Sequence, residues 1–351
     1  ASDVYKRQTL VCGVLWACSP EGPADEVTAP KLRLKVQSAF SFNQPVLGDS
    51  AQHLGEVVAS LGRDDIRLRV YDADKLVPPL QIFDAVTAGR IEAGYSWPVY
   101  WMGKIPATTL FGAVPFGPRA GEFLAWIQQG EGLGLWRELY ARHGAVPVPC
   151  GVLPPEASGW FTSPIEQPSD LEGLKIRYAG LGGKVLQKLG ASITMLAGGD
   201  IFPSLERGVL DATEYSMPAV DRALGFHKVA QHYYFPGWHQ PASILELIVN
   251  KEVWDSMVPE QRAYLETACN ANIVWSMTRG LAIQGEAIRY LEEQGVTLHR
   301  WSPEMLERFR ELSLEVIAEA AAEDADFARV LASQEAFRAE YARWASIAYA
   351  Q

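Results

Sequence analysis

A short unit that occurs twice is the feature of this sequence that most limits its fold. GRIEAGYSWP begins at Gly89 and GVLDATEYSMP begins at Gly208, and the second copy is one residue longer. In each, Gly can end a helix in the left-handed conformation, and a strand follows. In open α/β sheets the carboxyl ends of such strands are where ligands bind. The repeat predicts two similar lobes facing each other across a cleft, although short β-α-β units also resemble one another by chance.

Alternating strand and helix patterns surround both copies. In the first half we expect strands at 31–40, 66–74 and 91–97, separated by helices at 51–62 and 80–89. In the second half we expect strands within 171–180, 192–197 and 209–218, with helices at 181–191 and 199–208. Strands that alternate with helices predict an α/β fold with parallel or mixed sheets.

The last third of the sequence is mainly helical. A strand begins the segment 244–254, and long amphipathic helices are expected at 256–295, 302–324 and 326–350. The last of these carries an apolar stripe that includes Trp344, Ile347 and Tyr349. This stripe suits packing on the body of the protein or on a second copy, so a homodimer through the C-terminal helices is compatible with the sequence.

Charge and motif content narrow the function to ligand binding. The 351 residues carry a formal net charge of −11, which argues against nucleic acids and anionic membranes as main partners but not against a small anion. No G-x-S-x-G is present, Lys184 in the glycine-rich turn is followed by Val185, and His227 and His232 lack a nearby third ligand. No complete catalytic set is found, which favours a binding protein over an enzyme.

The N-terminus resembles an export signal. An apolar run from Leu10 to Ala17 follows Lys6 and Arg7 and is too short to span a bilayer. Cys18 ends a sequence that resembles a bacterial lipoprotein cleavage box, so lipidation there and a cleavable signal without lipid both remain open. The polar residues up to position 30 predict a tether.

Two cysteines remain beyond that segment. Cys150 and Cys269 are too few for a disulfide framework, and one bridge or two free thiols are both compatible with the sequence.

Two charged residues lie where the predicted strands end. Arg177 lies in a predicted strand beside Tyr178, where it could bind a carboxylate through two hydrogen bonds. Alternatively, the Arg177 side chain faces solvent and binds nothing. Glu214, at the end of the second repeat, would need a cation if it were buried. Alternatively, Glu214 is not buried and either caps a helix or lies at the rim of the cleft.

Aromatic side chains and one further acid complete the candidates. The aromatic side chains of the segment GYSWPVYW could form one wall of a small-ligand site, or they could belong to the ordinary hydrophobic core. These side chains are Tyr95, Trp97, Tyr100 and Trp101. Glu156 lies beside Trp160 and taken alone fits a loop acid. Gln240 is a single uncharged amide among the aromatic residues and prolines of FPGWHQPAS.

The stretches 173–191 and 198–241 resemble the solute-binding subunits of tripartite ATP-independent periplasmic (TRAP) transporters. YWMGKIPATTLFGAVPFGP (100–118) and GWF (159–161) fit the branch that binds 2-oxo and 2-hydroxy monocarboxylates. The resemblance covers roughly residues 31–345. It implies a two-lobed periplasmic-binding-protein-like α/β fold with long C-terminal helices. Lobe I would comprise 31–153 with part of 245–300, lobe II 154–244, and helices 256–351 would pack on both.

The resemblance also implies a ligand site. Arg177 would clamp the ligand carboxylate, and a sodium or calcium ion would bridge ligand and protein. The side chains of Glu156, Glu214 and Gln240 and the backbone carbonyl of Tyr215 would bind this ion. Membrane permease subunits would receive the small organic acid in the periplasm. A lyase-like enzyme or a receptor-coupled sensor on the same scaffold are the alternatives.

Three of these positions depart from the family pattern. Glu156 stands where the family commonly has Gln, Gln240 where it has Glu, and Tyr215 where it often has Trp. Carboxylate and amide oxygens both bind hard cations, so the exchange keeps two carboxylates and one amide. We therefore expect the metal site to persist with its charge moved; the alternative is that Gln240 marks the loss of the metal.

Overall fold

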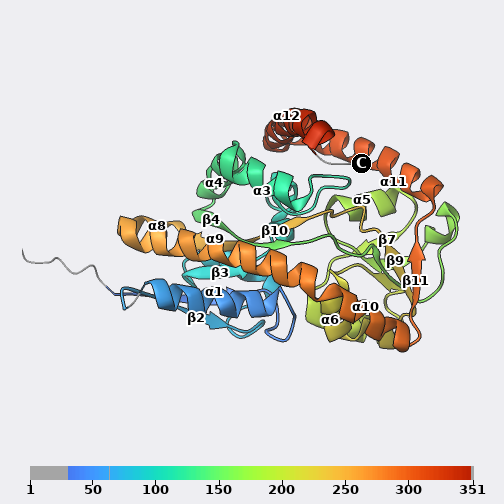
Figure 1. Ribbon diagram of the computed structural model, residues 1–351, viewed down its shortest axis with the longest axis horizontal. Coiled ribbons are helices and arrows are strands. Elements are labelled where there is room, and N and C mark those ends of the chain that lie inside the picture. The colour runs from blue at the N-terminus through green and yellow to red at the C-terminus, as the bar shows by residue number, and fades with distance from the viewer. Residues whose placement is uncertain (1–30, 63, 349–351) are drawn as a thin grey trace, which may run out of the picture. The chain divides into compact units, whose positions relative to one another are not determined.

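Two separate sheets form the framework of the chain. The structure is a computed structural model that describes residues 31–348 except Arg63. The predictions for residues 1–30, including lipidation at Cys18, and for Tyr349 lie outside the described residues. The elements within this part follow the expected α/β pattern (Figure 1).

The first sheet, which with its helices we call lobe I, has five strands in the order β2-β1-β3-β10-β4. β1, β2 and β3 are parallel, whereas β10 pairs antiparallel with both β3 and β4. Every residue of β4 and β10 is buried, as expected for strands covered on both faces. The strands are β1 (Leu32–Ser38), β2 (Ile66–Tyr71), β3 (Ala93–Ser96), β4 (Ala145–Leu153) and β10 (Ser243–Asn250).

The second sheet, in lobe II, has six strands in the order β11-β9-β5-β8-β6-β7. β6 pairs in parallel with β7 and β8, while β5 is antiparallel to β8 and β9. Its strands are short: β5 (Gly159–Phe161), β6 (Lys175–Arg177), β7 (Ser192–Thr194), β8 (Ala212–Thr213), β9 (His232–Phe235) and β11 (Thr297–Arg300).

Helices surround the sheets, and one of them passes along both lobes. α9 runs from α8, beside lobe I, to α10, beside lobe II (Figure 1). No helix of the described residues is long and apolar enough to cross a membrane. The helices are α1 (Gly48–Leu61), α2 (Ile82–Thr87), α3 (Ala120–Gln129), α4 (Gly132–Ala141), α5 (Gly180–Lys188), α6 (Gly198–Glu206), α7 (Pro218–Leu224), α8 (Lys251–Ser256), α9 (Pro259–Ala282), α10 (Gln284–Glu293), α11 (Pro303–Glu323) and α12 (Ala325–Ala348).

The two copies of the repeat occupy matching places in the two sheets. Gly89 follows α2 with φ +66°, and Gly208 follows α6 with φ +67°, so both end their helices in the left-handed conformation. β3 and β8 follow these glycines, one in each lobe. The expected equivalence is confirmed.

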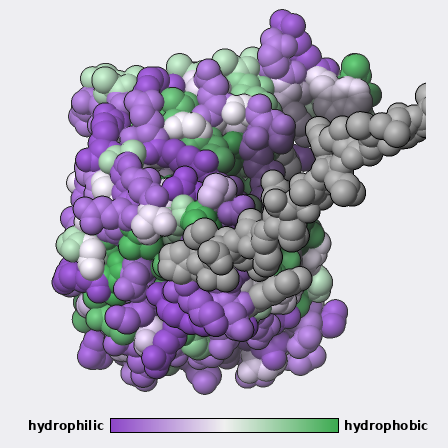
Figure 2. All heavy atoms as spheres, turned by 90° about the vertical axis from the view of Figure 1, so that its left-hand side faces the viewer, coloured by the Kyte–Doolittle hydropathy of each residue, from purple (hydrophilic) through white to green (hydrophobic). Residues whose placement is uncertain are grey.

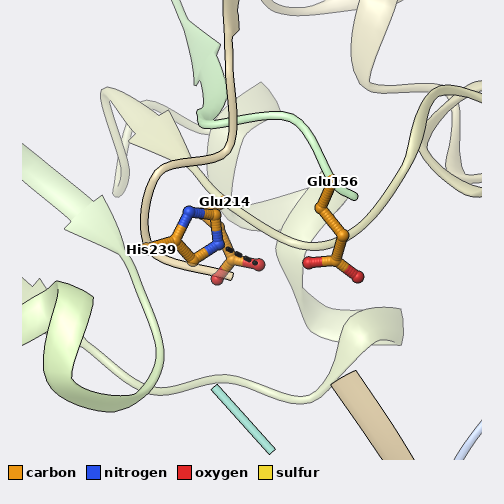
Figure 3. A group of neighbouring side chains, drawn as sticks. All are labelled: Glu156, Glu214 and His239. Atoms are coloured by element: carbon orange, nitrogen blue, oxygen red, sulfur yellow. Dashed lines mark ion pairs between the residues drawn. The ribbon is translucent and has the colours of Figure 1, made fainter. Parts of the chain in front are cut away.

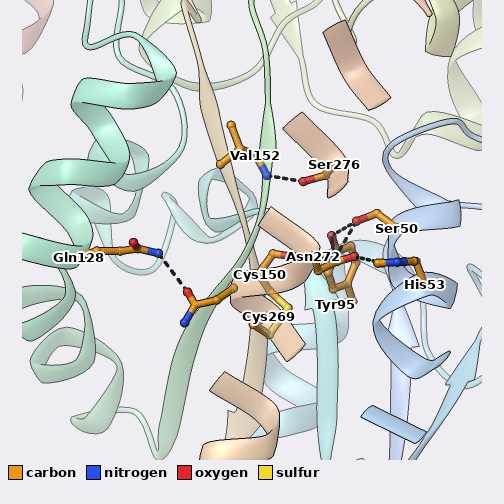
Figure 4. The surroundings of a disulfide bond; sticks show 10 residues. Ser50, His53, Tyr95, Gln128, Cys150, Val152, Cys269, Asn272 and Ser276 are labelled. Carbon is orange, nitrogen blue, oxygen red and sulfur yellow. Dashed lines mark hydrogen bonds between the residues drawn. A yellow bond between two sulfur atoms is a disulfide. The ribbon is translucent and has the colours of Figure 1, made fainter. Parts of the chain in front are cut away.

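A disulfide joins Cys150 of β4 to Cys269 of α9, which decides between the two states of these cysteines. Asn272, one turn further along α9, donates hydrogen bonds to Ser50 Oγ at 2.9 Å and to the carbonyl of Cys150 at 2.7 Å (Figure 4). The Tyr95 hydroxyl lies 2.7 Å from Ser50 Oγ in the same network. Disulfides persist in oxidising compartments, which agrees with an exported protein.

The helical last third differs from the prediction in two respects, and the exposure of two side chains on α12 excludes one of the two alternatives for its apolar stripe. The expected helix 256–295 is divided into α9 and α10 at Ile283, and the unpredicted β11 joins the edge of the second sheet. Periodicity alone does not mark this break, because Ile283 keeps a helical backbone. On α12, the Trp344 and Ile347 side chains are 60% and 80% exposed, so they do not pack on the body of the protein.

The face of lobe I shown in Figure 2 is mainly hydrophilic, with small scattered apolar areas. Such a face agrees with the formal net charge of −11.

Candidate functional site

Two chain segments pass between the lobes and bring candidate residues together. The first crossover, 154–158, joins β4 to β5 and carries Glu156; the second, 236–242, joins β9 to β10 and carries Gln240. Gly237 N–H donates to the Glu156 carbonyl at 3.0 Å. A Cβ at Gly237 would lie 2.4 Å from that oxygen, so glycine is required for the two crossovers to touch.

Arg177 is buried at the end of β6 and forms an ion pair with Glu214. Both side chains are about 1% exposed, which excludes a solvent-facing arginine and an acid at the rim. Arg177 Nη1 donates to Glu214 Oε2 at 2.8 Å and to the Glu214 carbonyl at 2.6 Å, and Nε donates to the Leu196 carbonyl at 3.3 Å. The guanidinium also lines the small cavity between the lobes, where it can meet a ligand.

Glu156 and Glu214 have opposite electrostatic surroundings. Burial raises the pKa of Glu156 well above its usual value, and the nearby Glu214 raises it further. Burial also raises the pKa of Glu214, but Arg177 and His239 outweigh this effect and lower it. Ser216 Oγ donates to Glu156 Oε1 at 2.9 Å, whereas Oε2 has no partner in the described structure. Glu156 therefore lacks a cation that Glu214 already has.

The second crossover contributes two polar side chains that are also incompletely bonded. Gln240 and His239 are each 2% exposed. Among the residues described, nothing donates to Gln240 Oε1, and both ring nitrogens of His239 lack a hydrogen-bond partner. One donor atom each from Glu156, Glu214 and His239 lie within 4.8 Å of one another (Figure 3).

The donor set fits a metal ion. Glu156 Oε2 and Gln240 Oε1 are buried oxygens that can accept but lack partners, and Glu214 supplies a second carboxylate. Buried polar atoms without partners are rare unless an ion or water binds them. These residues would hold a cation, which would offset the charge that burial makes costly at Glu156.

A small cavity lies between the lobes beside these groups. Its volume is ≈ 20 Å³, room for about one water molecule, so a larger ligand requires the lobes to move apart. All the predicted ligand-binding residues except Tyr95 line it. The lining is Phe40, Leu47, Trp97, Tyr100, Leu153, Glu156, Arg177, Tyr215, Ser216, Gln240 and Leu245.

The aromatic residues of the two repeats have different positions. Tyr215 lies beyond the end of β8, donates to Gln44 Oε1 at 3.0 Å, and has the Arg177 guanidinium 5.3 Å from its ring centre. Tyr95 lies within β3, is fully buried, and is not among the residues that line this cavity. The extra residue in the second copy and the shorter strand account for this difference.

Trp97 and Tyr100 form the aromatic wall on the lobe I side. Trp97 Nε1 donates to Ser243 Oγ at 2.6 Å, and its ring meets Tyr100 edge to face at 5.3 Å. Burial raises the pKa of Tyr100 to about 12, so its hydroxyl remains a hydrogen-bond donor at neutral pH.

Three residues near the site were not among the candidates predicted from the sequence. His239 adjoins Gln240 in sequence, Gln44 accepts from Tyr215, and Ser216 donates to Glu156. For His239, its place next to a predicted metal ligand was the available signal. For Gln44, no sequence signal links it to Tyr215, because the two belong to different lobes.

The chain belongs to the bacterial extracellular solute-binding protein family 7. Residues 39–324 match this family, whose members are solute-binding receptors. A monocarboxylate 2-oxoacid-binding periplasmic protein of Nostoc sp. is 35% identical over 294 residues, which are 84% of this chain and 81% of that protein. The resemblance to TRAP solute-binding proteins is thereby confirmed.

Two solved structures support the same assignment. A TRAP transporter solute-binding protein of Bordetella bronchiseptica, a dimer with copurified calcium and picolinate, has a TM-score of 0.89 and 31% identity, covering 91% of this chain and 95% of that one. A TRAP periplasmic solute-binding protein of Pseudoalteromonas atlantica with sodium and pyruvate has a TM-score of 0.86 and 31% identity, covering 90% and 96%. The expected two-lobed fold is confirmed.

Proposed function

We propose that this TRAP solute-binding protein captures a small 2-oxo or 2-hydroxy monocarboxylate, such as pyruvate or lactate. The observation that carries the proposal is Arg177, a buried guanidinium that lines the cavity between the lobes. A guanidinium is well suited to a carboxylate because the charge-assisted hydrogen bonds are strong and directional.

The remaining lining supports a short ligand with one carboxylate. Phe40, Leu47, Leu153 and Leu245 supply apolar walls, and among the lining residues Arg177 is the one cation. A second carboxylate on the ligand would be buried without a positive partner, which is costly.

A metal ion bound by Glu156, Glu214, Gln240 and the Tyr215 carbonyl would complete the site. The two carboxylates and one amide give the same charge as the family pattern with Glu and Gln exchanged. Sodium and calcium are the ions found in the related structures, and both accept oxygen donors. These residues would hold the ion, which would supply positive charge for the oxo or hydroxy oxygen of the ligand.

Transport requires binding and lobe closure rather than bond cleavage. The ligand would bind while the lobes are apart, and Trp97 and Tyr100 of lobe I would then close over Arg177 of lobe II. The closed form would present a surface that the permease subunits recognise in the periplasm.

A thermal-shift screen of organic acids tests this function. Purified protein is heated with pyruvate, lactate, malonate and longer 2-oxo acids, each with and without sodium or calcium, because a ligand bound to the native state raises the melting temperature. We expect the largest shifts with pyruvate or lactate in the presence of a cation. Equal or larger shifts with malonate, or no shift with any monocarboxylate, would contradict the proposal.

Lipid attachment at Cys18 and homodimer formation belong to the same proposal. Exposed Trp344 and Ile347 on α12 support a contact with a second copy, and the Bordetella bronchiseptica relative is a dimer. Light scattering on wild type and a Trp344→Ser/Ile347→Ser variant tests the dimer. Mass spectrometry of the membrane-associated protein tests the lipid.

A further inference from the structure

A second cavity lies against the two crossovers and shares no described lining residue with the cavity beside Arg177. Its volume is ≈ 630 Å³, which lies within the range of small-molecule sites. Pro155 of the first crossover and Pro236 and Pro241 of the second form part of its wall. We call this cavity the crossover pocket.

Most of the lining of the crossover pocket is apolar. The Phe116 ring is stacked on Trp238 with centres 5.8 Å apart, and Leu306 of α11 adds an aliphatic side chain. The Phe116 N–H donates to the Trp238 carbonyl at 2.8 Å, which holds the loop before α3 against the second crossover. A molecule that enters the pocket can therefore bury an aromatic or aliphatic body here.

Two arginines, Arg119 and Arg310, are the charged residues of this lining, and no acid accompanies them among the described lining residues. Arg119 forms no ion pair with any described residue. The Arg310 guanidinium lies 4.1 Å from the centre of the Phe116 ring, and its Nε is 3.7 Å from Glu307 Oε2. That ion pair is more than half exposed on both sides, so water screens it. The lining is thus positive in a chain whose formal net charge is −11.

We propose that the crossover pocket binds a second ligand, a small acid with one carboxylate or sulfonate group on an aromatic or long aliphatic body. The body would lie against Phe116 and Leu306, and the acidic group would meet Arg119 and Arg310. Guanidinium groups bind such anions through charge-assisted hydrogen bonds. The bulk of the body distinguishes this ligand from the short acid proposed for the site of Arg177. The inference does not depend on the identity of that short acid, because the two cavities share no lining residue.

Calorimetry with 2-naphthoate, octanoate and the neutral 2-naphthamide tests the charge requirement. We expect 2-naphthoate to bind at least about tenfold more tightly than 2-naphthamide. Arg119→Gln and Arg310→Gln should each weaken the binding of both acids about threefold to tenfold, since each arginine is partly exposed to water. The matched control is Arg308→Gln, because Arg308 is an exposed arginine of the same helix that pairs with Glu311 and does not line the pocket. No binding of either acid, equal affinities for the acid and the amide, or an equal loss in Arg308→Gln would overturn the proposal.

A blocking variant tests the location of the bound acid. Gly121, in the first turn of α3, lines the pocket, and a Cβ there would meet no atom within 4 Å. Gly121→Leu therefore adds a side chain at the pocket wall without a clash, and Leu favours a helix more than Gly does. Gly134 of α4 is equally open but does not line the pocket, so Gly134→Leu is the matched control.

The two glycine variants and one cleft variant are titrated with 2-naphthoate. We expect Gly121→Leu to lose binding, and Gly134→Leu and Arg177→Lys to match wild type. A loss in Arg177→Lys without a loss in Gly121→Leu would place the acid in the cleft between the lobes and refute the inference. Pyruvate-induced thermal shifts of wild type test the proposed function separately, so either conclusion can fail while the other stands.

Discussion

Replacing Glu156 with Gln should raise the stability of the cation-free protein but reduce the stabilisation that a bound cation gives. Without a cation, Glu156 faces Glu214 in a buried site and its carboxylate lacks a partner for Oε2. Removing its charge therefore relieves repulsion and stabilises the native state. With a cation, the same change removes one of two anionic ligands and weakens binding.

The size of the first effect follows from the geometry. Two unit charges 4.8 Å apart, the limit within which the donor atoms lie, repel by ~3.5 kcal/mol at an effective dielectric constant of about 20. The net effect is smaller than this repulsion, because Arg177 offsets the charge of Glu214 and Glu156 can bind a proton. A gain of about 1–3 kcal/mol should raise the melting temperature by a few degrees, at roughly 2–4 °C per kcal/mol for large domains.

Thermal unfolding at pH 8, with chelator and then with excess Ca²⁺, measures both effects. Glu156→Gln should melt higher than wild type in chelator and gain less from Ca²⁺, while Glu156→Gln/Gln240→Glu should regain the Ca²⁺ response. Glu166→Gln removes the same charge from an exposed position and should match wild type throughout. If Glu156→Gln binds Ca²⁺ and pyruvate as tightly as wild type, the idea that charge moved from position 240 to 156 is wrong.

Three further predictions concern other parts of the chain. Arg177→Lys should weaken pyruvate binding at least about tenfold by calorimetry, because one ammonium cannot replace hydrogen bonds worth about 1.5–3 kcal/mol each; unchanged affinity would exclude the carboxylate clamp. Replacing Cys150 and Cys269 with Ser should lower the free energy of unfolding in urea by about 2–5 kcal/mol, since the bond closes a long loop. Burial raises the pKa of Glu246 to about 8 despite hydrogen bonds from Trp101 and Tyr140, so wild type should lose stability relative to Glu246→Gln as pH rises from about 4.5 to 8, by at most about 1.4 kcal/mol per unit. Parallel pH profiles of melting temperature would contradict this last assignment.

Helices and strands could be predicted where a local sequence pattern, such as a helix-ending glycine or alternating apolar residues, was enough to determine them. Gly89 and Gly208 marked the ends of two helices, and alternation of apolar residues located β1 and β2. β11 was missed, because this short strand depends on its pairing with β9 rather than on its own sequence. The break at Ile283 was missed since helical periodicity continues across it.

The site was only partly predictable for a related reason. Arg177 and Glu214 could be found from their places at strand ends, and the departures at positions 156 and 240 drew attention through the family pattern. Tyr95 matched Tyr215 in the repeat, but one position of difference relative to the end of the strand places it in the core. His239, in the second crossover, is close to the site because Glu214 approaches it from the segment after β8, and this contact is visible only in the fold.

The contact between the two crossovers has a consequence for how ions and solutes exchange. The proposed cation ligands come from the crossovers and from lobe II, and none comes from lobe I. Crossovers act as the pivot when two lobes separate, and a pivot moves little while the tips swing widely. Opening would thus withdraw Trp97 and Tyr100 from the solute but leave the spacing of the cation ligands nearly unchanged. The ion would then stay bound at the crossovers through many rounds of solute uptake and release, and would not enter and leave with each solute molecule.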